Sequence, residues 1–296
     1  MAVIEILSLQ HIVVNGIVVT QAPHLNLKWA TLLRCKKWNE FVDQYTFSPR
    51  QMVSFYIRDV FMFGPNIGFI CGEGTMEDDP RKQFVFIRGD AVSVLMVVSV
   101  GWFEHYLVFV DQYRFPANKC VLETICGMKD EDGKLVGVAV KEVEEETGIV
   151  IDETKLVELG VTNPSVGGTF EKIYHYLYFE KMTRAQMEEK RSKVFGCAAE
   201  GEFTSVVFVS VYQYLWELRN PAFEDGKIQG AVLLCLSKCL TGGWRAKFWL
   251  FVGSIVCSGS VLCAMAVMCD WMTAMGASGW VVAGFVWVSL AFAACF

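Results

Sequence analysis

The stretch GMKDEDGKLVGVAVKEVEEETGI, residues 127–149, decides how the rest of the chain is interpreted. Its second part has the apolar spacing of a helix, and Gly148 is the residue type that most often ends one. At about 100° per residue, Glu142, Glu145 and Glu146 share one face of that helix. The neighbouring face is apolar and consists of Val136, Ala139, Val140 and Val143. We therefore predict a helix that packs on a core and presents three carboxylates together.

Three neighbouring carboxylates have two interpretations. On an ordinary surface helix they are a solvated acidic face, which is the common case for an acidic run. Alternatively they hold a cation, because clustered carboxylates repel one another unless a positive charge lies among them. Hard divalent ions such as Mg²⁺ or Mn²⁺ prefer oxygen ligands of this kind.

The complete pattern resembles the Nudix box, G-x5-E-x7-R-E-U-x-E-E-x-G-U with U aliphatic. Its matching positions here are Gly127, Glu142, Val143, Glu145, Glu146, Gly148 and Ile149. Two positions depart from the pattern. Gly133 replaces the first glutamate of the box, and Lys141 replaces arginine, which keeps the charge but loses the bidentate guanidinium fork.

Strand-like runs precede and follow the expected helix. Within 52–110, strands are predicted over residues 53–63, 66–76, 82–89 and 91–100, which carry β-branched and aromatic runs bounded by Gly, Pro and Asp. Residues 172–181 and 203–211 continue the pattern. Residues 28–44 are predicted to form an amphipathic helix and residues 226–240 a closing helix. The expected inward face of the first helix is Trp29, Leu32, Leu33, Trp38 and Phe41. This order predicts an α/β sandwich with a mixed sheet. The expected domains are an N-terminal extension (1–50), the main domain (51–240) and a C-terminal hairpin (244–296).

The resemblance extends over residues 15–240 to the ADP-sugar diphosphatases of plants and fungi, a branch close to the ADP-ribose pyrophosphatases. It is carried by MFGPNIGF, IRGDAVSVLMVV, VDQYRFPANKCVLETICGM, GEF and YLWELR, in addition to the box. It implies a Nudix α/β/α sandwich with a β-rich N-terminal extension, usually a homodimer. The implied reaction splits a nucleoside-diphosphate sugar into a nucleoside monophosphate and a sugar phosphate.

The resemblance also implies roles for individual residues. Glu142, Glu145, Glu146 and the main-chain carbonyl of Cys126 would bind Mg²⁺ or Mn²⁺. Glu145, Glu146 and a later glutamate, Glu202 with Glu200 as second choice, would be catalytic. Arg88 and Arg114 would contact phosphate or nucleotide, since guanidinium forks suit phosphate oxygens. Either arginine is equally well explained as half of a structural ion pair.

The end of the chain is apolar. Residues 248–268 and 276–296 are two runs of 21 residues without a charge. Each is long enough to cross a bilayer core of about 30 Å. Tryptophans 244, 249, 271 and 280 lie near the ends of these runs, as interfacial anchors do. We predict a two-helix transmembrane hairpin, with a buried soluble hairpin as the alternative. This makes the chain an integral protein of an organelle membrane, with the mitochondrial inner membrane favoured over the plastid.

Composition narrows the function classes. The net charge of −6 argues against a general nucleic-acid surface. The 11 cysteines include no CxxC pair, which indicates reduced thiols in an intracellular compartment. The first 20 residues have no signal-peptide pattern.

Two functions from different classes remain, beside a third interpretation, a lipid-linked diphosphate hydrolase, which would explain the hairpin but has no dedicated motif. The first is a membrane-anchored, metal-dependent nucleotide-sugar pyrophosphatase, which the three retained glutamates favour. The second is a Nudix-derived accessory subunit of a membrane complex, such as a respiratory assembly, with little or no turnover. Two features favour that second function. The family that the chain resembles has Pro-Ala before the box glycine, where this chain has Ile125 and Cys126, and the hairpin is an addition to the family pattern.

Overall fold

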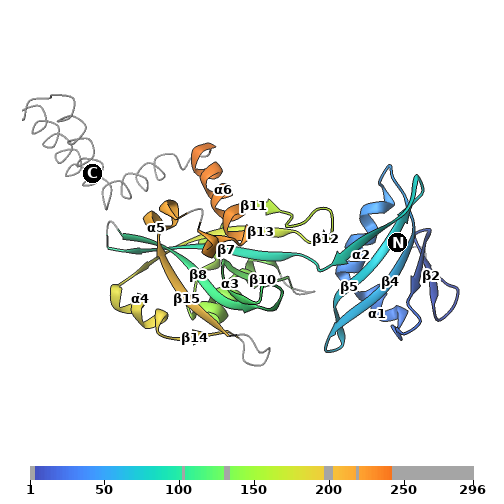
Figure 1. The fold of residues 1–296 in the computed structure, drawn as a ribbon, viewed down its shortest axis with the longest axis horizontal. Coiled ribbons are helices and arrows are strands. Elements are labelled where there is room, and N and C mark those ends of the chain that lie inside the picture. The colour runs from blue at the N-terminus through green and yellow to red at the C-terminus, as the bar shows by residue number, and fades with distance from the viewer. Residues whose placement is uncertain (1–3, 102–103, 130–133, 197–202, 218–219, 242–296) are drawn as a thin grey trace, which may run out of the picture. The chain divides into compact units, whose positions relative to one another are not determined.

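The computed structural model describes residues 4–101, 104–129, 134–196, 203–217 and 220–241 (Figure 1). By contacts, these residues divide into two compact units. The first comprises those within Met1–Ser93, Cys126–Ala139 and Gly160–His175, and the second those within Val94–Ile125, Val140–Leu159 and Tyr176–Phe296. The predicted domain limits at residues 50 and 240 remain predictions.

The first unit contains a seven-stranded mixed sheet, in the order β1-β2-β3-β4-β5-β6-β12. The pairs β3–β4 and β6–β12 are parallel, whereas β4–β5 and β5–β6 are antiparallel. The strand predicted over 66–76 is confirmed residue for residue. The strands are β1 (Ile4–Ile6), β2 (His11–Val14), β3 (Ile17–Gln21), β4 (Met52–Phe63), β5 (Asn66–Met76), β6 (Asp79–Ile87) and β12 (Thr169–Phe170).

Two helices, α1 (Trp29–Arg34) and α2 (Lys36–Thr46), replace the single helix predicted over 28–44. The break is at Cys35, whose backbone is extended, with φ −69° and ψ 113°. The Asn39 side chain donates to the Leu33 carbonyl across the break at 3.0 Å, which supplies a partner for a group at the end of α1. The predicted inward face is largely correct, because Trp29, Leu32, Trp38 and Phe41 are buried.

The core of the first unit lies between these helices and the sheet. Trp38 is fully buried, and its ring packs edge-on against Phe55 of β4 with 5.2 Å between centroids. Phe41 makes a similar contact with Phe55 at 5.4 Å. These rings join apolar side chains of β2, β3 and β5 in one cluster. The helices are therefore held to the sheet by aromatic packing.

An eight-stranded sheet has the order β11-β13-β7-β8-β15-β14, with β10 paired to β7 and β9 paired to β8. The predicted strand over 91–100 is confirmed as β7. Residues 91–98 of β7 are all buried, which shows that both faces of this strand are covered. The strands are β7 (Ala91–Val100), β8 (Glu104–Arg114), β9 (Lys119–Glu123), β10 (Ile125–Met128), β11 (Val157–Thr162), β13 (Ile173–Met182), β14 (Val194–Phe195) and β15 (Thr204–Ser210).

In the second unit, helices lie on both faces of the sheet. Tyr214 of α5 (Val211–Trp216) and Ile228 of α6 (Gly226–Thr241) pack in one cluster with Val209 of β15. The adjacent Phe208 points the other way, and Arg191 of α4 (Arg184–Arg191) lies over its ring at 5.8 Å. The arrangement of this unit is therefore α/β/α, as predicted (Figure 1). Short 3₁₀ turns cover Phe115–Ala117, Glu153–Lys155 and Pro221–Phe223.

The sequence interpretation missed α4. A local signal was present, because Thr183 and Gln186 form a capping box in which each side chain bonds to the other residue's backbone N–H. The helix has few apolar residues, and only Met187 is buried, so the apolar period is weak.

The predicted transmembrane runs, 248–268 and 276–296, lie outside the described residues. Within the described ranges, no helix is both long enough and apolar enough to span a bilayer.

The helix predicted from residues 127–149 is α3 (Leu135–Thr147), and Gly148 ends it with φ +64°. A Cβ atom on Gly148 would lie 2.4 Å from Cε1 of Phe195. The buried side of α3 differs from the prediction: Val138, Ala139 and Val143 are buried, whereas Val136 and Val140 are half-buried. Ala139 and Val143 are thus buried as predicted, whereas Val138 is buried in place of Val136 and Val140.

Two glycine substitutions in this helix are expected to change stability in opposite directions. Gly148→Ala should lower the free energy of unfolding by about 2 kcal/mol or more, because alanine is strained at positive φ and meets Phe195. Gly137→Ala should raise it by about 0.5–1 kcal/mol, since Gly137 lies inside α3 with open space around its Cβ position. Urea denaturation of both variants measures this, and equal effects would contradict the assigned helix end.

Candidate functional site

The box residues that the structure describes lie on β10 and on α3. β10 carries Cys126 and Gly127, and α3 carries the three glutamates that the sequence singles out. Residues 130–133, which include the departure at Gly133, lie outside the described part. The helix end at Gly148 is fixed by a hydrogen bond from its N–H to the Glu144 carbonyl at 2.8 Å. The helical spacing therefore sets Glu142, Glu145 and Glu146 on one side of α3, as predicted.

The three glutamates differ in burial. Glu146 is 5% exposed, whereas Glu142 and Glu145 are half-buried. Backbone contacts fix this end of the helix: the Thr204 hydroxyl donates to the Glu146 carbonyl at 3.2 Å, and the Gly196 N–H donates to the Glu145 carbonyl at 2.9 Å. The glutamate side of α3 is thus the boundary between its buried and its solvated faces.

Lys141, which replaces the arginine of the box, lies beside one box glutamate. Its Nζ is 3.4 Å from a carboxylate oxygen of Glu145, one helical turn further on. Both side chains are more than a third exposed, so the pair contributes little to stability. Its consequence is local: it places a positive charge beside Glu145.

The donor chemistry of this side of α3 fits a divalent cation, because carboxylate oxygens are the ligands that Mg²⁺ and Mn²⁺ prefer. The described side chains do not by themselves complete a centre. Within the described part of the chain, no group of three or more acidic, histidine or cysteine side chains is placed to hold a metal. Cys126 is half-buried on β10, and Glu200 and Glu202 lie outside the described residues. The metal and catalytic roles of these residues therefore remain predictions.

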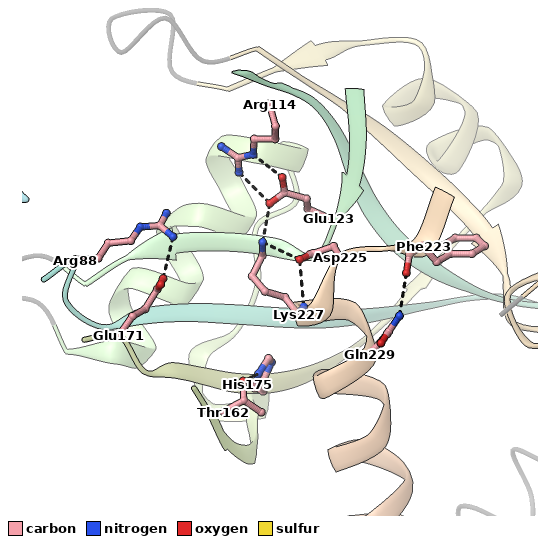
Figure 2. Close-up of polar contacts among 10 residues, drawn as sticks. All are labelled: Arg88, Arg114, Glu123, Thr162, Glu171, His175, Phe223, Asp225, Lys227 and Gln229. Atoms are coloured by element: carbon pink, nitrogen blue, oxygen red, sulfur yellow. Dashed lines mark hydrogen bonds and ion pairs between the residues drawn. The ribbon is translucent and has the colours of Figure 1, made fainter. Parts of the chain in front are cut away.

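Arg88 is paired with a buried carboxylate (Figure 2). Its Nη1 donates to Glu171 at 2.9 Å, and Glu171 is 7% exposed. The backbone N–H of Arg88 also donates to the Phe170 carbonyl at 3.3 Å, next to this pair. The ion-pair interpretation of Arg88 is thus present in the structure. Its guanidinium retains donors beyond the one used here, so the predicted phosphate contact remains a prediction.

Arg114 belongs to a network of four charged residues (Figure 2). Its Nε and Nη2 both donate to the buried carboxylate of Glu123, the second at 2.9 Å. Lys227 of α6 donates to the same carboxylate at 2.8 Å and to Asp225 at 3.1 Å. The network therefore ties β8, β9 and the start of α6 together. The sequence interpretation did not identify Glu123, Asp225 or Lys227; the only signal was an acidic residue, Glu123, directly after the apolar run 120–122.

The two carboxylates of this network have opposite pKa shifts. Burial by itself would raise the pKa of Glu123, but Arg114 and Lys227 together hold it below its ordinary value. Burial raises the pKa of Asp225, and Lys227 offsets only part of that effect. One carboxylate is thus stabilised in its ionised form, whereas ionisation of the other is opposed by the fold.

This difference predicts unequal effects of neutralising the two residues. Glu123→Gln should lower the free energy of unfolding at pH 7 by about 1–2 kcal/mol, because it removes the buried carboxylate that Arg114 and Lys227 share. The loss is smaller than for a fully buried pair, since the Arg114 side chain is 40% exposed and Lys227 keeps its pair with Asp225. That loss should shrink as the pH falls below the ordinary glutamate pKa. A carboxylate whose pKa is lower in the folded state contributes its full stability above the unfolded-state pKa. This contribution is lost as the pH falls through the folded-state pKa.

Asp225→Asn is the matched control. At pH 7 this substitution should leave the free energy of unfolding nearly unchanged or raise it, because it removes an ionised group whose pKa is raised by burial. The asparagine can still accept a hydrogen bond from the backbone N–H of Lys227. Urea denaturation between about pH 2 and pH 8 measures both, because the lowered pKa of Glu123 places its pH dependence below the ordinary glutamate range. A larger loss for Asp225→Asn than for Glu123→Gln at pH 7 would refute the assignment.

No family model matches the chain. Individual proteins are nevertheless similar to it in sequence. The chain is 36% identical over 174 residues to Nudix hydrolase 14, chloroplastic, of Arabidopsis thaliana, a match that covers 54% of this chain and 56% of that protein. It therefore spans little more than half the length of that relative.

Two bacterial relatives are covered more completely. The ADP-ribose pyrophosphatase of Escherichia coli (strain K12) is 30% identical over 164 residues, which cover 53% of this chain and 70% of that protein. The ADP-ribose pyrophosphatase of Bacillus subtilis (strain 168) is 26% identical over 151 residues, which cover 51% and 74%.

Among solved structures, one described as "Crystal structure of ADP compounds hydrolase" is similar with a TM-score of 0.47 and 13% identity, over 67% of this chain and 97% of that chain. A likeness at this level carries no argument of its own. The family assignment depends on the sequence relatives and on the placement of the box glutamates on α3. The chain belongs to the Nudix hydrolase family.

Proposed function

We propose that the protein hydrolyses the pyrophosphate bond of an ADP-sugar or ADP-ribose in the presence of Mg²⁺ or Mn²⁺. The observation that carries this proposal is the placement of Glu142, Glu145 and Glu146 on one side of a helix that Gly148 ends. A docking module has no need of three mutually repelling carboxylates. The names of the relatives support an ADP-containing substrate.

In the proposed reaction, water adds to one phosphorus atom of the pyrophosphate. The bond from that phosphorus to the bridging oxygen breaks, and the bridging oxygen leaves with the other phosphoryl group. The products are AMP and a sugar phosphate. A bound divalent cation would neutralise phosphate charge and lower the pKa of a bound water.

The chain's own residues have distinct tasks in this proposal. Glu142, Glu145 and Glu146, with the Cys126 carbonyl, would hold the cation, and Glu202 would accept the proton of the attacking water. Arg88 and Arg114 would orient phosphate oxygens. In the structure both guanidinium groups are already positioned by buried carboxylates, Glu171 and Glu123, so their orientation requires little ordering when substrate binds.

Substitutions within α3 test this proposal. Glu145→Gln and Glu146→Gln should each lower kcat for ADP-ribose by at least about 100-fold, because each removes a charged ligand that acts on the reacting phosphate. Glu144→Gln is the matched control, since Glu144 is exposed on the same helix and should leave kcat within about twofold of the wild type.

Turnover is measured as the release of AMP, with and without EDTA. EDTA removes the divalent cation and should abolish turnover. Equal loss of activity in all three variants would contradict the roles assigned to Glu145 and Glu146. Absence of turnover in the wild type, together with co-purification of the protein in a stoichiometric membrane assembly, would favour the accessory-subunit function instead.

We also propose that the protein is anchored in a membrane by residues 248–268 and 276–296, with the mitochondrial inner membrane as the favoured location. The support is the length of the two uncharged runs and the tryptophans at their ends. Such an anchor would place hydrolysis of a soluble nucleotide at a membrane surface.

Alkaline extraction of membranes tests the anchor. The full chain should stay in the membrane pellet after carbonate treatment. Val256→Arg and Val286→Arg together should shift it to the supernatant, because a charge at a helix centre costs about 3 kcal/mol for insertion. Full-length protein that is extracted like a peripheral protein would refute the anchor and leave the hydrolase proposal unaffected.

A further inference from the structure

We propose that Lys190 and Thr204 are positioning residues of the candidate site, because they hold the last turn of α3, which carries two of the box glutamates. These glutamates are Glu145 and Glu146. Neither positioning residue belongs to the Nudix box, and Lys190 lies on α4, a helix that the sequence interpretation missed. This role rests on the proposed function, which gives the glutamates the task of holding a divalent cation.

The last turn of a helix needs partners from outside it, since its final carbonyl groups have no N–H of the same helix to accept from. The carbonyl of Glu145 accepts a hydrogen bond from the Gly196 N–H at 2.9 Å. The carbonyl of Glu146 accepts one from the Thr204 hydroxyl at 3.2 Å. Gly196 directly follows β14, and Thr204 is the first residue of β15, so two neighbouring strands hold the end of α3 (Figure 1).

Thr204 is itself fixed by the sheet. It is 1% exposed, and it lies opposite Phe195 in the antiparallel ladder between β14 and β15. Its hydroxyl meets the Glu146 carbonyl in a buried place. Removal of the hydroxyl would take this donor away from a buried carbonyl, which is costly, so the last turn of α3 would rearrange to find another partner.

Lys190 reaches the same helix end from α4. Its Nζ donates to the carbonyl of Gly148, the residue that ends α3. The same Nζ lies 5.7 Å from the centre of the Phe195 ring, in a cation–π contact. A positive charge at the carboxyl end of a helix is favourable, because the last carbonyl groups form the negative end of the helix dipole. Lys190 therefore stabilises the end of α3 by its charge as well as by a hydrogen bond.

The cations that follow Lys190 in the chain are used differently. Arg191 donates to Glu188 at 3.0 Å. Lys193 donates to Glu189 at 2.7 Å. Both cations are exposed, whereas Lys190 is half-buried. Lys190 thus joins α4 to the end of α3, and Lys193 supplies a control of the same residue type three positions further on.

The setting of this turn decides what Glu145 and Glu146 can bind. The ligand atoms of a working site are held within about 0.5 Å of their productive positions. Helix ends fray, and a frayed last turn would move both carboxylates out of place, because fraying changes the backbone angles that direct them. Removal of the outer partners of metal ligands commonly weakens metal binding by about 10- to 100-fold. Loss of either positioning residue is therefore expected to weaken cation binding.

Mn²⁺ binding to the full chain, measured by EPR without substrate, tests the inference. Lys190→Met and Thr204→Val should each raise the Kd for Mn²⁺ by about tenfold. Lys190→Arg and Thr204→Ser keep a donor at each position and should recover most of this loss. Lys193→Met is the matched control, since it makes the same change to an exposed lysine and should leave the Kd within about twofold of the wild type.

Two further measurements separate positioning from a general loss of stability. In Lys190→Met and Thr204→Val, the amides of residues 143–148 should exchange hydrogen faster, whereas those of β7 should exchange as in the wild type. At low Mn²⁺, kcat for ADP-ribose should fall by about tenfold with KM within about twofold, and saturating Mn²⁺ should restore kcat. Faster exchange in β7 as well would show a general loss of stability and contradict the positioning role.

An unchanged Kd for Mn²⁺ in either Lys190→Met or Thr204→Val would overturn the inference. An equal loss in Lys193→Met, no recovery in the two conservative variants, or a wild type that binds no Mn²⁺ would also overturn it. Failure of the proposed function gives a different result. A wild type that binds Mn²⁺ but does not hydrolyse ADP-ribose would contradict the hydrolysis, while Mn²⁺ binding and hydrogen exchange would still decide the positioning role.

Discussion

The rotational setting of α3 is the constraint on which the rest of the candidate site depends. Ala139 and Val143 are buried, and this fixes the direction of every other side chain on the helix. Glu146, one turn beyond Val143, is buried as a result, while Glu142 and Glu145 lie at the edge of solvent. Gly148 then ends the helix in the left-handed region, so that no further turn covers the glutamates.

Buried carboxylates hold the two arginines that the family resemblance assigns to phosphate. Glu171 pairs with Arg88, and Glu123 pairs with Arg114 while sharing Lys227 with Asp225. Each of these acids is costly to bury, so its cation is a requirement of the fold. The same pairing orients the guanidinium groups before any ligand is present. The structural and functional interpretations of the arginines are therefore compatible.

Much of the secondary structure could be predicted from the sequence, for reasons that are local. The strand over Asn66–Met76 is bounded by turn residues and rich in β-branched and aromatic side chains, and the helix over Leu135–Thr147 has a clear apolar period and a glycine stop. The misses also have physical causes. The break at Cys35 depends on a side-chain hydrogen bond across it, and α4 has too few apolar residues for periodicity to detect.

The sequence by itself determined the family and the identity of the three glutamates, because box spacing and helical period are both properties of the local chain. It also supplied the two uncharged C-terminal runs on which the anchor proposal depends. Only the tertiary structure decided which side of α3 is buried, which acids hold Arg88 and Arg114, and that aromatic rings from α2, β4 and β12 pack together. These features join residues as far as 129 positions apart, such as Phe41 and Phe170. Contacts at such separation are set by how sheets and helices pack, and no local pattern encodes them.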